Sequence, residues 1–269
     1  MLLIFLMLQV FSISILVRYS NSHKAWYMGI AYEITGRINK SYNNLTSFFA
    51  LADNNRQLAT ENTRLGNLMA ENFTKVDTSA QEKIFEIKLD TTIVMRKYYW
   101  RPAHVINNSV SAQNNFITLE RGRNQGITEN MAVVSAAGIV GVVTDVSDNM
   151  SLVMSLLHRK SNTSIALKNT GTTGILEWNG VNPERLQLTG IPKSAKLAKG
   201  DTVITSNLSL NFPANLMVGT IAGFKLDEGG NNYKIDIMPA TNFFNIDYVS
   251  VIENLYLKEQ KELEKRIKR

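Results

Sequence analysis

The sequence predicts a mainly β protein with two small antiparallel β-barrel domains, preceded by an N-terminal transmembrane helix and a short coiled-coil helix. Three observations support this prediction. The chain opens on an uncharged apolar run, and a heptad repeat of leucines follows. All five prolines and thirteen of the sixteen glycines lie beyond residue 101. The early part is therefore expected to be helical, and the later part to consist of strands and turns.

Composition excludes several functional classes. The chain has no cysteine, which rules out disulfides, thiolate zinc sites and a cysteine nucleophile. The net charge is +6, but residues 258–269 alone hold six Lys or Arg against three Glu. The body of the chain is only mildly basic, so we expect no nucleic-acid partner. No cofactor or metal is predicted.

Residues 1–17 form the expected transmembrane anchor. Only three of them are polar, and no charge precedes Arg18. An apolar run of roughly 17–25 residues can span the ~30 Å hydrocarbon core, so this segment is at the short end. The alternatives are a buried core helix and a cleavable signal peptide, for which Ser20 and Ser22 offer a small-x-small site.

The charges around this span leave its orientation open. Arg18 and Lys24 follow it, which by the positive-inside rule puts the rest of the chain in the cytoplasm. A true start upstream, with a short basic cytoplasmic tail, would reverse the balance. We expect this reversed case: one pass through the cytoplasmic (inner) membrane, with the bulk of the chain on the periplasmic side.

Residues 26–73 form the expected helical stalk. Leu51, Leu58 and Leu65 are seven residues apart, which is the spacing of one coiled-coil position. If these leucines occupy d positions, asparagines occupy two of the a positions, a pattern that favours a register-fixed parallel dimer. The predicted seam is Phe48, Leu51, Asn55, Leu58, Asn62, Leu65 and Met69. Gly66 interrupts it, and an amphipathic helix packed on its own β domain is the alternative.

Beyond a linker and lead-in over residues 74–97, short β-branched runs alternate with turn residues. About eleven such strands, with no long helical stretch between them, predict small antiparallel barrels or sandwiches. We place the first barrel at residues 98–168 and the second at 169–254, with the alternative that the last strand returns to the first barrel. Residues 255–269 form a charged tail, either solvated or in contact with acidic lipids or a partner.

Ordered motifs in this region resemble those of the MreC family, rod-shape-determining proteins of the bacterial elongation machinery. They are Ile117-Thr-Leu-Glu-Arg-Gly-Arg-Asn-Gln-Gly-Ile127, Gly138-Ile-Val-Gly141-Val-Val, Gly174-Ile-Leu, Lys199-Gly-Asp-Thr-Val-Ile-Thr-Ser206, Phe212-Pro213 and Met217-Val-Gly-Thr-Ile221. Asn130 and Asn207 stand where the family commonly has glycine, and asparagine tolerates left-handed backbone. Turns, strand bends and close contacts are assigned to Gly122, Gly126, Gly138, Gly141, Gly200, Asp201, Ser206, Asn207, Pro213 and Gly219.

The resemblance implies a membrane-anchored scaffold outside the cytoplasm that is needed for rod shape. It also implies self-association, as a dimer or higher order. The implied partners are wall-synthesis proteins, notably an elongation-specific penicillin-binding transpeptidase, and other shape-determining membrane proteins. The sequence does not specify the partner-binding surface.

Catalysis is not expected. Paired barrels also host serine proteases, and the candidates for such a site are His23, His104, His158 and Ser206. The sequence has no Gly-x-Ser-x-Gly, His-Glu-x-x-His or phosphate-cradling glycine motif. A periplasmic adaptor of an efflux or secretion system is the stronger alternative, and a membrane-anchored protease-like enzyme is the weaker one. Adaptors place a helical hairpin inside a β domain, whereas here the helical pattern precedes every strand.

Overall fold

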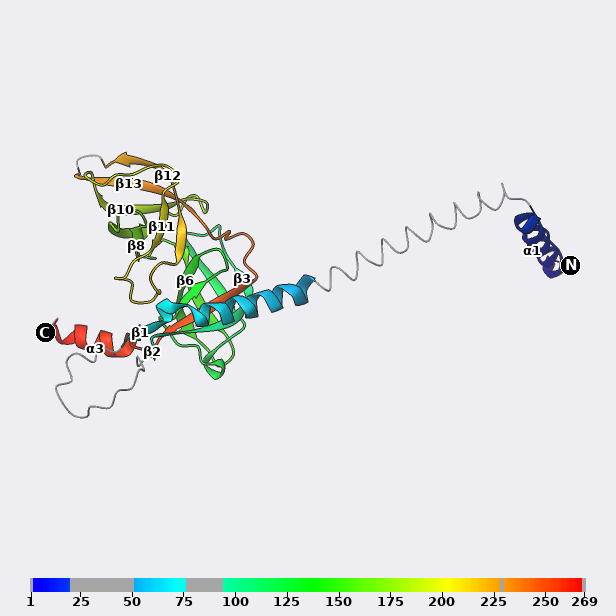
Figure 1. Cartoon of the computed structure of the whole chain (residues 1–269), viewed down its shortest axis with the longest axis horizontal. Helices are drawn as coiled ribbons and strands as arrows, with labels where there is room; N and C mark the ends of the chain where they lie inside the picture. The colour runs from blue at the N-terminus through cyan, green and yellow to red at the C-terminus, as the bar shows by residue number, and fades with distance from the viewer. Residues whose placement is uncertain (1, 20–50, 76–93, 228–229, 268–269) are drawn as a thin grey trace, which may run out of the picture. The chain divides into compact units, whose positions relative to one another are not determined.

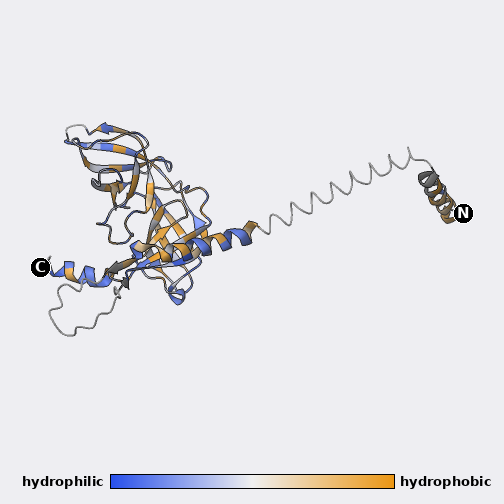
Figure 2. Ribbon diagram, viewed as in Figure 1, coloured by the Kyte–Doolittle hydropathy of each residue, from blue (hydrophilic) through white to orange (hydrophobic). Residues whose placement is uncertain are grey.

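The computed structural model describes residues 2–19, 51–75, 94–227 and 230–267 (Figure 1). The chain divides into two units, Met1–Asn55 and Arg56–Arg269. In the first unit, α1 (Leu2–Tyr19) is strongly apolar (Figure 2). Among the described residues, no helix is both long and apolar enough to cross a membrane. The anchor over residues 1–17 therefore stays a prediction.

The first barrel is closed by six antiparallel strands in the order β14-β3-β4-β7-β6-β5. These strands are β3 (Tyr98–Asn108), β4 (Asn114–Leu119), β5 (Ala132–Val134), β6 (Ile139–Val146), β7 (Ser151–His158) and β14 (Tyr248–Asn254). The last strand pairs along β3, with Tyr248 opposite His104 and Asn254 opposite Tyr98. The chain therefore returns to the first barrel after it has built the second, which is the alternative left open by the sequence.

The second barrel is also closed by six antiparallel strands, in the order β10-β13-β12-β11-β8-β9. These are β8 (Thr163–Leu167), β9 (Thr173–Glu177), β10 (Leu186–Pro192), β11 (Thr202–Thr205), β12 (Met217–Leu226) and β13 (Asn232–Pro239). Because β8 pairs with β9 and β11, the border lies between His158 and Thr163 and not near residue 168. The alternation in β8 identifies a strand but does not say which sheet the strand joins.

Shorter elements surround the barrels. Residues 51–68 form a helix, here called the stalk helix, followed by η1 (Ala70–Asn72). Within the expected linker, β1 (Phe73–Lys75) pairs with β2 (Val94–Arg96) as a separate two-stranded sheet. The remaining elements are η2 (Arg123–Gln125) and α3 (Leu257–Ile267), and α3 makes the described part of the C-terminal tail helical.

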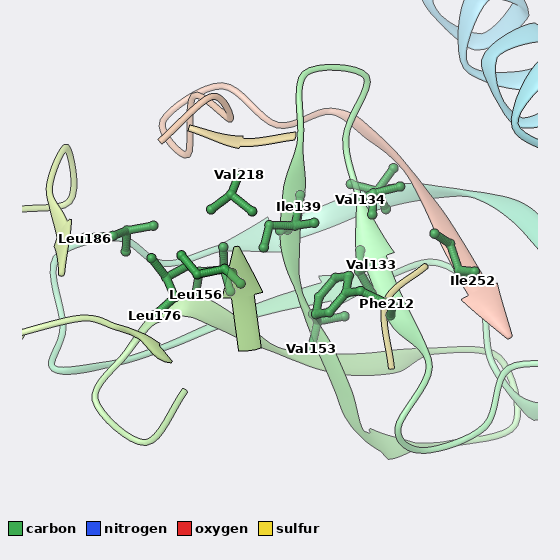
Figure 3. Packing of buried hydrophobic residues seen from close by; sticks show 14 of the residues in the cluster. Val133, Val134, Ile139, Val153, Leu156, Leu176, Leu186, Phe212, Val218 and Ile252 are labelled. Carbon is green, nitrogen blue, oxygen red and sulfur yellow. The ribbon is translucent and has the colours of Figure 1, made fainter. Parts of the chain in front are cut away.

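Alternating inward side chains of both barrels form one buried hydrophobic cluster (Figure 3). Val133 and Val153 come from the first barrel, Leu176 and Leu186 from the second, and Phe212 from the segment between β11 and β12. Burying each large aliphatic side chain stabilises the fold by about 1.5–3 kcal/mol. The shared cluster packs the two barrels of the second unit against one another.

Candidate functional site

One face of the stalk helix packs against the first barrel through small and polar side chains. Thr63 is buried, and its hydroxyl lies 2.7 Å from the Ser250 hydroxyl on β14. Gly66 is buried against the indole of Trp100, where a Cβ would lie 2.7 Å from ring carbon Cε3. A larger residue at position 66 would therefore displace either the helix or the indole.

Two asparagines fix the backbone and side chain of Trp100. The Asn67 carboxamide accepts from the Trp100 N–H at 2.9 Å and donates to the Trp100 carbonyl at 2.9 Å. Asn72 accepts from the Trp100 indole N–H at 3.0 Å and donates to the Gly66 carbonyl. At this point β3 extends beyond its pairing with β4, which begins at Val105. Asn67 therefore supplies the hydrogen bonds that a neighbouring strand would give.

The opposite face of the stalk helix carries the heptad leucines in solvent. Leu51, Leu58 and Leu65 are 56%, 61% and 50% exposed, and Leu68 is 62% exposed. Such a row of exposed leucines on one helix face is the surface that a coiled-coil partner covers. The docked face and the leucine face are distinct, so the packed helix of the alternative prediction coexists with a free leucine row.

The other predicted seam residues lie in different settings. Asn55 and Asn62 are exposed on the same helix. Met69 lies beyond the last helical residue and packs against the hydrophobic cluster, so it is not part of the leucine face. Phe48 and the rest of residues 26–50 lie outside the described residues.

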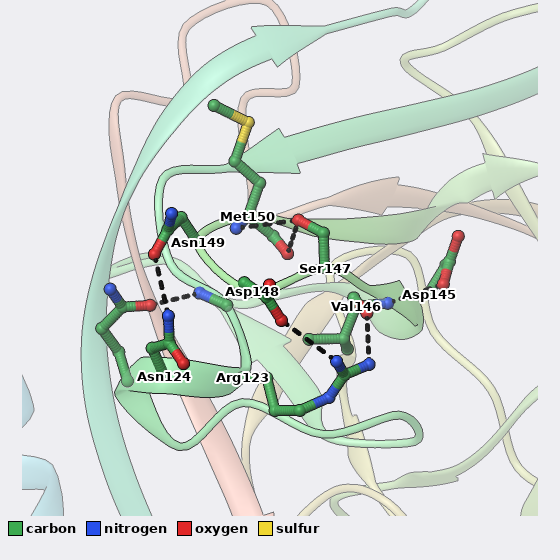
Figure 4. A network of polar contacts seen from close by, with 10 residues as sticks. Arg123, Asn124, Asp145, Val146, Ser147, Asp148, Asn149 and Met150 are labelled. Carbon is green, nitrogen blue, oxygen red and sulfur yellow. Dashed lines mark hydrogen bonds and ion pairs between the residues drawn. The ribbon is translucent and has the colours of Figure 1, made fainter.

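The family motif around Gly122 forms a turn that holds two loops together. A Cβ on Gly122 would lie 2.5 Å from both the Met150 nitrogen and the Ser147 oxygen. Figure 4 shows the β6–β7 turn against η2, where the Arg123 guanidinium pairs with the Asp148 carboxylate at 3.2 Å. Gly126 ends η2 at φ 79°, in the left-handed region that favours glycine.

Three further glycines mark close backbone approaches. A Cβ on Gly138 would lie 2.6 Å from the Met217 carbonyl oxygen, which belongs to the second barrel. Cβ atoms on Gly141 and Gly219 would collide with the Met154 and Met238 carbonyl oxygens of neighbouring strands.

The motif before β11 also shapes turns. Gly200 has φ 88°, and the Asp201 carboxylate accepts from the Ala198 N–H at 2.8 Å. The carbonyl of buried Pro213 accepts from the Thr205 hydroxyl at 2.6 Å. These contacts assign this motif to the architecture of the second barrel.

Left-handed backbone is found at one of the two asparagines that stand where the family commonly has glycine. Asn130 has φ 67° and therefore takes the conformation that glycine would take. Asn207 does not have a positive φ; among the described residues, the second non-glycine residue with positive φ is Asn215, also at φ 67°. Asn207 lies in a turn in which the Ser209 N–H donates to the Ser206 carbonyl at 3.2 Å, so this turn forms without left-handed backbone at position 207.

The candidate catalytic residues are not assembled. Ser206 is buried, with its hydroxyl 2.7 Å from the Ser164 hydroxyl, and no hydrogen bond in the described part of the chain joins it to a histidine. His104 is on β3 and His158 on β7, while His23 lies outside the described residues. The described residues also hold no cluster of three or more potential metal ligands.

Electrostatic environments differ between the two described histidines. The ring nitrogens of His104 lie 3.2 Å from a Glu120 oxygen and 3.3 Å from an Asp247 oxygen. Burial, and secondarily the charge of Lys160, lowers the pKa of His158, whose Nδ1 accepts the Lys160 N–H at 3.0 Å. A neutral His158 therefore suits its site, which stabilises a turn.

These features define a class of protein: a tandem β-barrel in which polar side chains hold turns and a docked helix, and in which that helix exposes a row of leucines. The family model "Rod shape-determining protein MreC, barrel core" matches residues 105–253, more than half of the chain. The chain belongs to the MreC family of cell shape-determining proteins.

The Listeria relative agrees with this assignment, and the Listeria structure agrees with the fold. The cell shape-determining protein MreC of Listeria monocytogenes is 27% identical over 66% of this chain and 61% of its own length. A solved Listeria MreC structure has a TM-score of 0.56 and 21% identity, covering 82% of this chain and 94% of that one. A complex between Penicillin-Binding Protein (PBP2) and MreC from Helicobacter pylori matches with a TM-score of 0.47 and 18% identity, over 59% of this chain and 100% of that one. The chain thus matches about three fifths of the Listeria relative.

Proposed function

We propose that this protein is a non-catalytic scaffold of the cell-elongation machinery, which pairs through its stalk helix and presents its barrels to proteins of peptidoglycan synthesis. The observation that carries the proposal is the leucine face. It is exposed on a helix whose other side is already fixed to the first barrel by Thr63, Gly66 and Asn67. Pairing through this face would fix two barrel units relative to one another and double the number of docking sites, which raises the effective concentration of each.

Anchoring at the N-terminal end is part of the same proposal. The large apolar side chains of α1 from Leu2 to Leu8 are exposed by about half or more, which water disfavours and lipid does not. The absence of cysteine suits an extracytoplasmic location. As partners we propose an elongation-specific penicillin-binding transpeptidase and other shape-determining membrane proteins, on the ground of family membership.

Pairing is tested by disulfide cross-linking in membranes. The chain has no cysteine of its own, so every disulfide between two copies comes from the introduced residue. Leu58→Cys in the full chain is expected to form a disulfide-linked dimer on mild oxidation. Arg64→Cys is the matched control, since Arg64 is exposed on the same helix about 120° away from Leu58. Equal cross-linking of the two variants, or none for Leu58→Cys, would contradict pairing through the leucine face.

Location is tested separately by thiol labelling. Asn231 is exposed just before β13, so Asn231→Cys is expected to react with a membrane-impermeant maleimide in intact spheroplasts. Labelling that occurs only after lysis would place the second barrel in the cytoplasm and would overturn this part of the proposal.

A further inference from the structure

A polar groove of about 410 Å³ lies where the stalk helix meets the first barrel. The helix contributes Arg56, Ala59 and Thr60. The barrel contributes residues of β3, of the segment after β4 and of β14: Pro102, Ala103, His104, Glu120, Arg121 and Tyr248. The groove adjoins the stretch of β3 that lacks pairing with β4, next to the Asn67 contact with Trp100. It is thus built from the same docking that fixes the helix.

The two guanidinium groups of this groove lack carboxylate partners. Within the described residues, no ion pair joins Arg56 or Arg121 to an acid, whereas Arg64 pairs with Glu61 and Arg101 pairs with Glu253. The nearby acids contact the ring of His104 and neither arginine: Glu120, which also lines the groove, and Asp247. Both guanidinium groups are therefore available to an anion from outside.

The surroundings of Arg121 make an anion more favourable still. The side chain is partly buried, and burial together with the neighbouring charge of Arg101 lowers its pKa. Arg101 carries the same charge as Arg121 and repels it. The partners of Arg101 are Glu253, at 2.8 Å, and the ring of Tyr99, at 4.6 Å. A bound anion would offset the repulsion between the two arginines.

We propose that this groove binds a carboxylate side chain from an acidic peptide segment of a partner protein. A guanidinium presents a planar fork of donors that matches a carboxylate in bidentate geometry. The volume exceeds that of a single small ion, and Pro102, Ala103 and the ring of Tyr248 give apolar contacts for the neighbouring peptide atoms. Tyr248 is itself held by the His104 ring, with centroids 5.0 Å apart.

A second copy of this chain, paired through the leucine face, would not occupy the groove. At 3.6 residues per turn, Arg56 and Thr60 each lie about 160° around the helix from Leu58. The groove therefore stays open when the leucines pair, and it takes a different protein. Because the two surfaces are separate, failure of one proposal leaves the other intact.

Binding is measured by fluorescence anisotropy of the full chain in detergent with a rhodamine-labelled peptide Gly-Glu-Glu-Glu-Gly. The matched probe is Gly-Gln-Gln-Gln-Gly. We expect the glutamate peptide to bind and the glutamine peptide to bind at least tenfold more weakly. Arg121→Gln and Arg56→Gln are each expected to weaken binding of the glutamate peptide roughly tenfold, the effect of losing one charged hydrogen-bonding partner.

Arg64→Gln is the matched control, since it removes one positive charge from the same helix at a paired site. Its binding is expected to equal that of the wild type, and circular dichroism confirms that each variant is folded. Equal losses in all three variants would show a response to net charge alone and overturn the site. Equal affinity for the two peptides would overturn it as well, and so would binding of inorganic phosphate or anionic vesicles by a chain that does not bind the glutamate peptide.

Discussion

At the residue scale, glycines in the strands are required by the carbonyl groups of neighbouring strands. Gly141 on β6 faces the Met154 carbonyl on β7, and an added Cβ would also lie 3.0 Å from Val153 Cγ1. The Met154 carbonyl is backbone, and the Val153 side chain is β-branched and buried, so neither can move aside easily and the strands themselves would have to separate. Gly223 on β12 is different, because nothing lies within 4 Å of the position of its Cβ.

Alanine substitutions at these two positions are therefore expected to differ. Gly141→Ala should lower the free energy of unfolding by about 1–3 kcal/mol, the usual effect of overpacking. Gly223→Ala should leave it nearly unchanged. Urea unfolding followed by circular dichroism makes the comparison, and equal effects of the two substitutions would contradict the close approach at Gly141.

His158 gives a pH dependence with a definite sign. Its pKa is lowered in the folded state, so the unfolded chain binds more protons near and below the usual histidine pKa of about 6.5. The stability contributed by neutral His158 is present above that value and is lost as the pH falls through it towards the lower folded pKa. His158→Gln is expected to flatten the fall in unfolding free energy between pH 7 and pH 5. An unchanged slope would show that His158 is not responsible.

At the element scale, the stalk helix shows what the sequence can and cannot predict. The heptad of Leu51, Leu58 and Leu65 predicts a coiled-coil seam; the three leucines are exposed on the helix, and pairing through them stays a prediction. The docked face was not predictable from hydrophobic periodicity, because its contacts come from Thr63, Asn67 and Gly66. Gly66 looked like an interruption of the coil, whereas it provides the space for Trp100.

Asn67 is expected to account for much of the docking. Asn67→Ala would leave the N–H and carbonyl of buried Trp100 without these partners, at a cost of about 1–3 kcal/mol. Asn62→Ala, which changes an exposed residue of the same helix, should alter stability by less than about 0.5 kcal/mol. Unfolding monitored by tryptophan fluorescence compares the two, and similar small effects would mean that the helix is held by other contacts.

At the scale of the whole molecule, the second barrel is an insertion into the first. The strands from β8 to β13 are built between β7 and β14, and only then does β14 close the first barrel against β3 and β5. The strand and turn pattern predicted small barrels or sandwiches, and the motifs predicted the family and, through it, two barrels. Which strands pair across more than a hundred residues depends on register and closure, which strand patterns in a single sequence do not encode.

The inserted arrangement gives several motif residues a structural role. Gly138 allows the β5–β6 turn to approach Met217 of the second barrel, and Thr241 bonds both Ser135 and the Ile139 carbonyl. These contacts join the barrels through short polar groups. The motif that contains Gly138 therefore helps to set the position of one barrel against the other.

Cell shape in a strain depleted of this protein tests scaffolding most directly. We expect alanine at His158 or Ser206, one at a time, to preserve rod shape at normal protein abundance. Simultaneous alanine substitution of Leu51, Leu58 and Leu65 should give rounded cells although the protein is present and its barrels are folded. Loss of rod shape from either single substitution, with abundance and β-sheet content unchanged, would contradict the scaffold function and indicate catalysis.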